Sequence, residues 1–296
     1  MGFGLGSLFA GSFSETLGRN IVYMGSMAIY LLFIMSCGLA PNFGAKISLR
    51  FLTGSFGSTP LTCAGGTVAD LWTALEATFG FPILVIPAFG GPVLGPVIGS
   101  YIGDGKVSLR WTEWSMLILG ALVLILVLGF QPETYTPLLL KWKAHHFRQL
   151  TGDERYRAEI EIVDHSLLAR LRTSAYRPFI FVRTEPLVMV IALYLSIVYI
   201  VLFTFFGGYN KIFYETYGIS EGLTNIIWVA MLVGILCAFP LVPLIYSWTK
   251  KEYNIANANN TVIRPEIRLW FVMMGGSFAI PISLFWMGWT SYVSLS

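Results

Sequence analysis

Few residues in this sequence have types and spacing that could do chemistry, and none of them forms an enzyme motif. The H-E-x-x-H, G-x-S-x-G and P-loop patterns do not occur. Glycines alternate from Gly2 to Gly6, but without the strand, turn and helix of a dinucleotide site. Cys37, Cys63 and Cys237 lie in apolar segments without C-x-x-C or metal-ligand spacing. We therefore predict that the chain is not an enzyme and has no catalytic residues, no metal site and no cofactor.

Ionisable side chains within apolar segments are stronger candidates, because they are costly in a bilayer and are usually kept for function. The acidic residues lie in loops or at the ends of apolar segments, and Arg50 is the candidate inside one. Asp70 ends the same expected helix about 30 Å further on, so these two residues cannot pair. Arg50 therefore either pairs with a side chain on another helix or extends towards water.

A second group of charged residues lies at the junction of the first two apolar segments. Glu15, Gly18 and Arg19 form a tight turn between an acid and a base, which on its own is an ordinary capped turn. Asp70, at the end of a later apolar segment, returns to the same membrane face. A pair of carboxylates around Arg19 is geometrically allowed there.

The segment 90–103 has a stripe of small residues, because glycine recurs every fourth position at Gly91, Gly95, Gly99 and Gly103. A second helix can approach such a smooth face closely, which favours association within lipid. Pro92 and Pro96 each remove a backbone donor, so the same helix should bend. The segment 222–249 has a matching face at Ala230, Gly234 and Ala238. We predict that the two faces pack together, either as a plain packing surface or as a moving interface.

The elements that position these residues are membrane helices. The 296 residues are 55% hydrophobic and only 12% charged, with a mean hydropathy of +0.69, which is too apolar for a soluble domain. Charge-free runs occur at 1–14, 20–45, 51–69, 77–103, 114–132, 187–210, 222–249 and 269–296. A bilayer needs about 20 helical residues per crossing. The sequence therefore predicts an all-α polytopic membrane helix bundle with about seven full spans and one partial span at the start.

Basic residues indicate the orientation. Most Lys and Arg side chains fall on the side that carries residues 133–185, and the other side has Lys46, Lys106, Arg110 and Lys211. The positive-inside rule makes the first side cytoplasmic. The net charge of +3 does not indicate nucleic-acid binding, because the basic residues lie in loops and not along one aromatic-studded face. We expect an integral protein of the plasma membrane, with the vacuolar membrane as the alternative, and no obligate protein partner is evident.

Residues 131–185 form the only long polar segment, with apolar residues at roughly helical spacing among basic ones. We predict three parts: a first helical block over 1–130, a cytoplasmic linker with amphipathic helices over 131–185, and a second block over 186–296. His145, His146 and His165 belong to the linker, where solvated histidines are expected and not metal ligands.

In order along the chain, several motifs resemble the major facilitator superfamily, and within it the fungal drug:proton antiporters with twelve spans. The segment Gly11 to Tyr23 resembles the family's loop motif after the second span. Arg50-Phe-Leu-Thr-Gly54 resembles its fourth-span motif, and Gly91 to Gly99 resembles its fifth-span antiporter motif. Pro132-Glu-Thr-Tyr, Leu150-Thr-Gly-Asp153, Arg177-Pro-Phe and Glu185-Pro186 resemble the linker of the fungal subgroup. The match covers essentially the whole chain.

The resemblance implies a midplane cavity for substrate and protons between two halves that rock in the membrane. It implies that Glu15, Gly18, Arg19 and Asp70 latch the cytoplasmic face, that Arg50 takes part in proton coupling, and that the fifth span packs on the eighth. It places 1–130 at family spans two to six and 186–296 at spans seven to nine. The chain is then incomplete relative to twelve spans, and no carboxylate remains near the membrane midplane.

We therefore expect a transporter that exports small drug-like or polyamine compounds in exchange for protons, with the lipid bilayer, substrate and protons as its partners. The alternative is a truncated membrane protein that does not transport, from an incomplete gene model or a degenerate paralogue. Coding sequence found upstream and downstream would favour the exporter.

Overall fold

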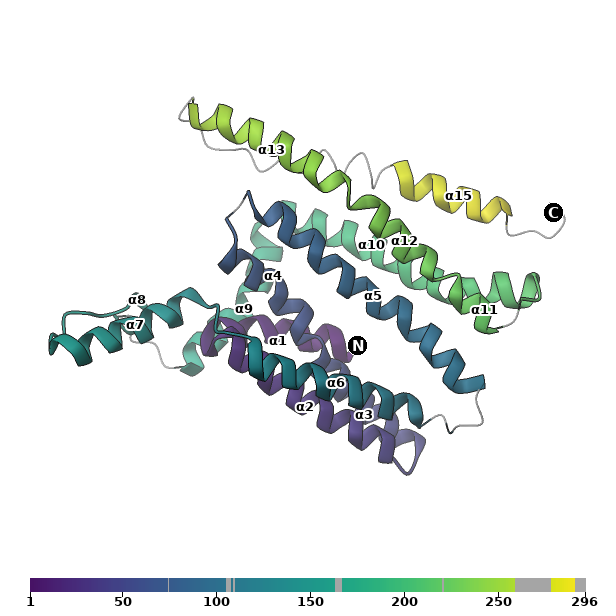
Figure 1. The fold of residues 1–296 in the computed structure, drawn as a ribbon, viewed down its shortest axis with the longest axis horizontal. Coiled ribbons are helices and arrows are strands. Elements are labelled where there is room, and N and C mark those ends of the chain that lie inside the picture. The colour runs from purple at the N-terminus through teal and green to yellow at the C-terminus, as the bar shows by residue number, and fades with distance from the viewer. Residues whose placement is uncertain are drawn as a thin grey trace. The chain divides into compact units, whose positions relative to one another are not determined.

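The computed structural model describes residues 1–73, 75–104, 108, 110–162, 167–219, 221–258 and 278–290. Every regular element in these ranges is a helix, which confirms the predicted all-α membrane bundle (Figure 1). The chain divides into two compact units. Unit 1 is Met1–Leu71 with Lys106–Ala192, and unit 2 is Trp72–Gly105 with Leu193–Ser296. The predicted boundaries at 130 and 185 stay a prediction.

Unit 1 contains a bundle whose centre is α2 (Arg19–Leu39). This helix packs on α3 (Phe43–Gly57) and on α6 (Trp111–Phe130). A second set of contacts joins α1 (Gly2–Leu17) to α3, to α4 (Thr59–Leu71) and to α9 (Leu167–Thr184). The loops after α1, α4 and α6 lie at one end of this bundle, which we call the linker end. The α2–α3 loop and the start of α6 lie at the opposite end.

The closest helix crossing of unit 1 joins α1 and α3 through glycines. A Cβ at Gly2 would collide with the carbonyl oxygen of Phe51, and a Cβ at Gly6 would collide with that of Ser55. Gly54 on α3 faces the backbone of α1 in turn, because a Cβ added there would lie 3.3 Å from the nitrogen of Phe3. Small residues four apart allow this approach in the way expected for membrane helices.

The polar segment after α6 forms a helical hairpin of α7 (Thr136–Thr151) and α8 (Glu159–Ile162). Arg148 binds both carboxylate oxygens of Glu161, at 2.8 and 3.0 Å, and also donates to the carbonyl of Tyr156. The hydrogen bonds from Arg148 lower the pKa of Glu161 to about 2. The α7 helix ends at Gly152, whose φ of +69° is the left-handed conformation that glycine adopts readily.

Unit 2 is built around α5 (Ala77–Asp104), which packs on α11 (Glu221–Ile226), α12 (Val229–Ala238) and α13 (Leu241–Ala258). Thr73 and Glu76 exchange hydrogen bonds just before α5, in the manner of a capping box. The helix α10 (Pro186–Tyr209) begins in unit 1 and enters unit 2 at Leu193. The π-helix η1 (Asn210–Thr216) and α15 (Ile280–Thr290) complete the described part of this unit.

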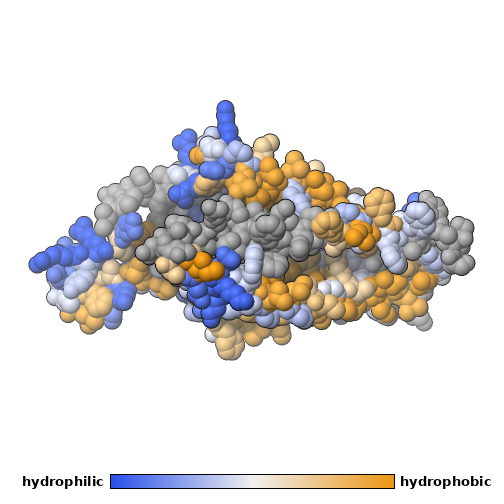
Figure 2. Space-filling model, turned by 90° about the horizontal axis from the view of Figure 1, so that it is seen from above, coloured by the Kyte–Doolittle hydropathy of each residue, from blue (hydrophilic) through white to orange (hydrophobic). Residues whose placement is uncertain are grey.

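Within the described ranges, five helices are long and apolar enough to cross a membrane: Arg19–Leu39, Ala77–Ile102, Trp111–Phe130, Pro186–Phe205 and Val229–Ala256. The predicted span 51–69 is instead two helices that meet at Ser58, next to Pro60, which has no backbone N–H to donate. Most of the predicted span 269–296 lies outside the described residues. Figure 2 shows apolar side chains over much of the visible surface, with hydrophilic ones at the left end, where α7 and α8 lie in Figure 1, and in smaller groups near the middle.

Candidate functional site

At the linker end of unit 1, Arg19 begins α2 and forms a buried ion pair with Asp70 at the end of α4. Its Nε lies 2.5 Å from Asp70 Oδ2, and its side chain is only 9% exposed. Its Nη1 donates to the hydroxyl of Ser14 at 3.1 Å. The guanidinium lies against Gly66, where a Cβ would be 2.5 Å from Cζ. A glycine is therefore required at this position if the guanidinium is to keep its place.

The start of α2 is capped by a carboxylate from a distant part of the chain. Glu133 accepts from the backbone N–H groups of Arg19 and Asn20, at 2.9 and 3.1 Å, and from those of Thr134 and Tyr135 in its own loop. An acidic group is favourable at a helix N-terminus, because free N–H groups and the helix dipole both attract negative charge. The carboxylate thereby joins the α6–α7 loop to α2.

Gly18 makes this cap possible in two ways. Its φ of +100° and ψ of 156° belong to a conformation that is essentially restricted to glycine. A Cβ there would also lie 2.8 Å from Glu133 Oε2 and 2.7 Å from Leu138 Cδ2. We call Ser14, Arg19, Asp70 and Glu133 the linker-end cluster.

The structure brings together only part of the predicted latch. Arg19 and Asp70 are paired and Gly18 shapes the turn, but Glu15 is exposed and has no ion pair among the described residues. The second carboxylate at this end is Glu133, in the loop between α6 and α7. Sequence reasoning had only the Pro132-Glu-Thr-Tyr motif to indicate it, because a cap on a distant helix leaves no local periodicity.

At the opposite end of unit 1, Arg50 pairs with a side chain on another helix, which was one of the two alternatives left open by the sequence. Its Nη2 lies 2.5 Å from Oε1 of Glu113 in the first turn of α6, and Nζ of Lys46 lies 3.5 Å from the same oxygen. The Glu113 side chain is only 2% exposed. We call Lys46, Arg50 and Glu113 the far-end cluster. Sequence reasoning missed Glu113 because it directly precedes an apolar run and resembles a loop acid.

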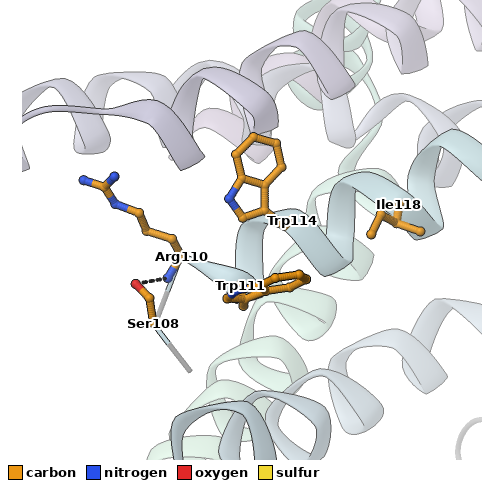
Figure 3. A pocket seen from close by; sticks show the side chains of 5 residues that line it. All are labelled: Ser108, Arg110, Trp111, Trp114 and Ile118. Carbon is orange, nitrogen blue, oxygen red and sulfur yellow. Dashed lines mark hydrogen bonds between the residues drawn. The ribbon is translucent and has the colours of Figure 1, made fainter. Parts of the chain in front are cut away.

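The start of α6 is rich in aromatic and basic side chains. Ser108, Arg110, Trp111, Trp114 and Ile118 line a shallow pocket of about 400 Å³. Figure 3 shows the two indole rings on the first turns of α6, with Arg110 just before them. Tryptophan and arginine are typical of the membrane–water interface. Glu113 is therefore a buried carboxylate within a turn of that interface.

The predicted glycine stripe lies on α5, which packs on α12 as expected, but the stripe is not on the face of α5 that makes this contact. The helix α5 does contact α12, yet Cβ atoms at Gly91, Gly95, Gly99 and Gly234 would meet nothing within 4 Å. Ala230 and Ala238 are exposed, and Pro92 and Pro96 lie within a continuous helix. The surroundings of Gly103 lie outside the described residues.

The face of α5 that packs is the other one. Val93 is fully buried, and a Cβ at Gly90 would lie 3.8 Å from Leu232 on α12. Val93 lies two residues from both Gly91 and Gly95, and two residues are about 200° of helix rotation, so the stripe is on the opposite side. Close contact between the two small faces is not present in this conformation.

No group of three His, Cys, Asp or Glu side chains that could hold a metal ion occurs in the part of the chain that the structure describes. The linker-end cluster and the far-end cluster are held by ion pairs. Each joins helices that lie within unit 1.

A family model, Major Facilitator Superfamily, matches residues 1–296. The chain is 48% identical to the MFS-type transporter kojT of Aspergillus oryzae over 296 residues, which are 99% of this chain and 52% of that protein. It is 36% identical to the uncharacterized transporter C794.04c of Schizosaccharomyces pombe, covering 100% of this chain and 53% of the relative. It is 32% identical to an ascochitine biosynthesis cluster MFS transporter of Didymella fabae, covering 98% and 56%. The chain thus spans about half the length of these curated relatives, and no solved structure matches it.

Proposed function

Since the chain belongs to the major facilitator superfamily, we propose that it acts in the proton-coupled export of small drug-like or polyamine compounds by alternating access. The observation that carries this proposal is the linker-end cluster, which coincides with the loop motif whose family role is to hold the cytoplasmic face. Its arginine is buried, paired and braced from three helices or loops.

We propose that the linker end faces the cytoplasm, because the basic residues of the 131–185 segment lie on this side. In the outward-facing state, the Arg19–Asp70 pair and the Glu133 cap hold the ends of α2 and α4 and the loop after α6 together. This makes one rigid end against which the other half of a transporter can close. Glu15, which is exposed, remains available for a contact with another helix.

The substrate class remains the one expected from the motifs, namely small drug-like compounds or polyamines. The name of the Didymella fabae relative connects that protein with a biosynthesis cluster, which favours a small fungal metabolite as a second candidate substrate. Either class is small enough for a cavity near the membrane midplane.

The test is transport by the complete gene product in proteoliposomes, with ethidium and spermidine as probes. An inward-directed proton gradient should drive probe movement in the opposite direction, and a protonophore should abolish it. Equal transport with and without the gradient would refute proton coupling. The matched pair Asp70→Asn and Glu76→Gln compares a half-buried acid that is paired with buried Arg19 with an exposed acid, and only Asp70→Asn should slow transport.

A further inference from the structure

Glu113 has an unusual position among the acidic residues. In the part of the chain that the structure describes, the buried charged side chains are Arg19 and Glu113. Arg19 lies at the linker end, whereas Glu113 lies at the far end and accepts from Arg50 at 2.5 Å, with Lys46 at 3.5 Å from the same oxygen. One buried carboxylate thus faces two cations.

The two cations are held less firmly than the carboxylate. The side chains of Arg50 and Lys46 are 49% and 39% exposed, and they lie one turn apart on α3. Both can therefore turn towards water without any change in the backbone. Glu113 differs from them, because its side chain is only 2% exposed and its Cβ faces Gly38 of α2.

The far-end cluster also links α3 and α6, two helices that both contact α2. The α3 helix packs on α1 as well. The two ion pairs to Glu113 join α3 to α6 directly. A change in the charge of Glu113 therefore acts on the α3–α6 link while α2 keeps both helices in place.

We infer that Glu113 is a proton-binding carboxyl, and that its protonation releases Arg50 and Lys46 and so opens the link between α3 and α6. The inference rests on the proposed function for its role in transport. A proton from the water at the far end adds to the carboxylate and gives a neutral acid, and nothing else is consumed. The neutral acid tolerates its buried site, whereas an unpaired buried carboxylate would not. Arg50 and Lys46 then have no anion between them, and each turns to water.

The groups that face Glu113 set its proton affinity together. From α3 they are Lys46 and Arg50, and from α2 the phenol of Tyr30 interacts electrostatically with Arg50 and Glu113. The buried thiol of Cys37, also on α2, lies 3.9 Å from the carbonyl of Lys46. On α6 itself, Arg110 precedes Glu113 by one turn. The two cations and the helix N-terminus stabilise the anion, and burial stabilises the acid.

The first test needs no substrate. Infrared difference spectra of the reconstituted protein between alkaline and acidic buffer should show a carboxylic-acid C=O band that is lost in Glu113→Gln and shifted in Glu113→Asp. The exposed Glu185→Gln should keep the band. Glu113→Asp keeps a carboxyl with a shorter reach, so its shifted band also covers the case in which Glu113→Gln does not fold. An unchanged difference spectrum in Glu113→Gln, or an unshifted band in Glu113→Asp, would overturn the inference.

The second test connects the proton to transport in the complete gene product, with ethidium as the probe. Glu113→Gln should lose gradient-driven accumulation but keep ethidium counterflow, which involves no net proton movement, and Glu113→Asp should recover part of the accumulation. Loss of counterflow as well would assign Glu113 a structural role and refute the inference. If the wild type shows no gradient dependence, the proposed function fails. If the wild type couples and Glu113→Gln couples equally, the inference fails alone.

Discussion

Replacement of Gly66 by alanine tests whether the buried arginine of the linker-end cluster is held in one place. The new methyl group would be 2.5 Å from Cζ and from Nη1 of Arg19. The guanidinium has little room to retreat, because Asp70 lies 2.5 Å from Nε and Ser14 lies 3.1 Å from Nη1. Its side chain is also 9% exposed, so water cannot readily replace these partners.

The magnitude follows from the displacement. Ordinary van der Waals contact requires the guanidinium to move by about 1 Å, which stretches a close ion pair and leaves two charges imperfectly paired. Overpacking of this kind costs about 1–3 kcal/mol. The ceiling is the loss of one partner of a buried pair, about 3–5 kcal/mol. Alanine gains about 1 kcal/mol over glycine as a helix former, so the expected net loss is about 1 kcal/mol, within a range of about 0–2 kcal/mol.

The assay is thermal unfolding of the purified protein, followed by tryptophan fluorescence. Gly25→Ala is the matched control, because a Cβ at Gly25 in α2 meets nothing within 4 Å. Gly66→Ala should lower the unfolding midpoint, and Gly25→Ala should keep or raise it. In an Arg19→Met background the cost of Gly66→Ala should largely disappear. Equal midpoints for the two alanine variants, or the same loss with and without Arg19, would refute this account of the cluster.

Three further predictions concern the linker end and the hairpin. Gly18→Ala should cost about 1–3 kcal/mol in thermal unfolding, because φ is +100° there and the Glu133 cap leaves no space; stability equal to wild type would contradict the cap geometry. Glu133→Ala should cost about 1–2 kcal/mol through the uncapped start of α2, and Glu133→Gln should cost less, since an amide oxygen still accepts; equal losses would show that hydrogen bonding is not the cause. The pKa of Glu161 is lowered from 4.5 to about 2, so its pairing with Arg148 stabilises the α7–α8 hairpin above about pH 4.5 and is lost as the pH falls towards 2. Hydrogen exchange of the hairpin should rise in that window, and Glu161→Gln should raise it at neutral pH; a flat pH response would count against the pair.

Sequence pattern alone predicted the helical class, most of the spans, and that Arg19 and Asp70 lie at the same membrane face. These depend on hydropathy over about 20 residues and on the alternation of helix ends between two membrane faces, both of which are local or additive. The contact of α5 with the helices of 222–249 was also expected. The acidic partners of Arg19 and Arg50 were not expected, because Glu133 in the loop after α6 and Glu113 at the start of α6 flank an apolar run and look like ordinary loop acids.

The glycines show a second limit of sequence pattern. A stripe of four glycines indicated close packing on α5, yet the closest glycine crossing joins α1 and α3 through Gly2, Gly6 and Gly54. Spacing identifies a face that can approach a neighbour. It does not identify which neighbour is present, because that depends on how the whole bundle is assembled.

Because the glycine stripe on α5 has open space around it, a substitution there should change transport without lowering stability. In this conformation a Cβ at Gly95 meets nothing within 4 Å, so Gly95→Ala should keep or raise the unfolding midpoint by helix propensity alone. If the stripe closes against another helix during the transport cycle, the same methyl group obstructs that state, and a leucine obstructs it more. Ethidium transport should therefore fall in the order wild type, Gly95→Ala, Gly95→Leu, while stability does not fall. Gly129→Ala on α6, where a Cβ also meets nothing within 4 Å, is the control; it should keep or raise the unfolding midpoint in the same way and leave transport unchanged. Full transport by Gly95→Leu would show that the stripe is not a moving interface, because no conformation of the cycle would then require the space that the glycine leaves open.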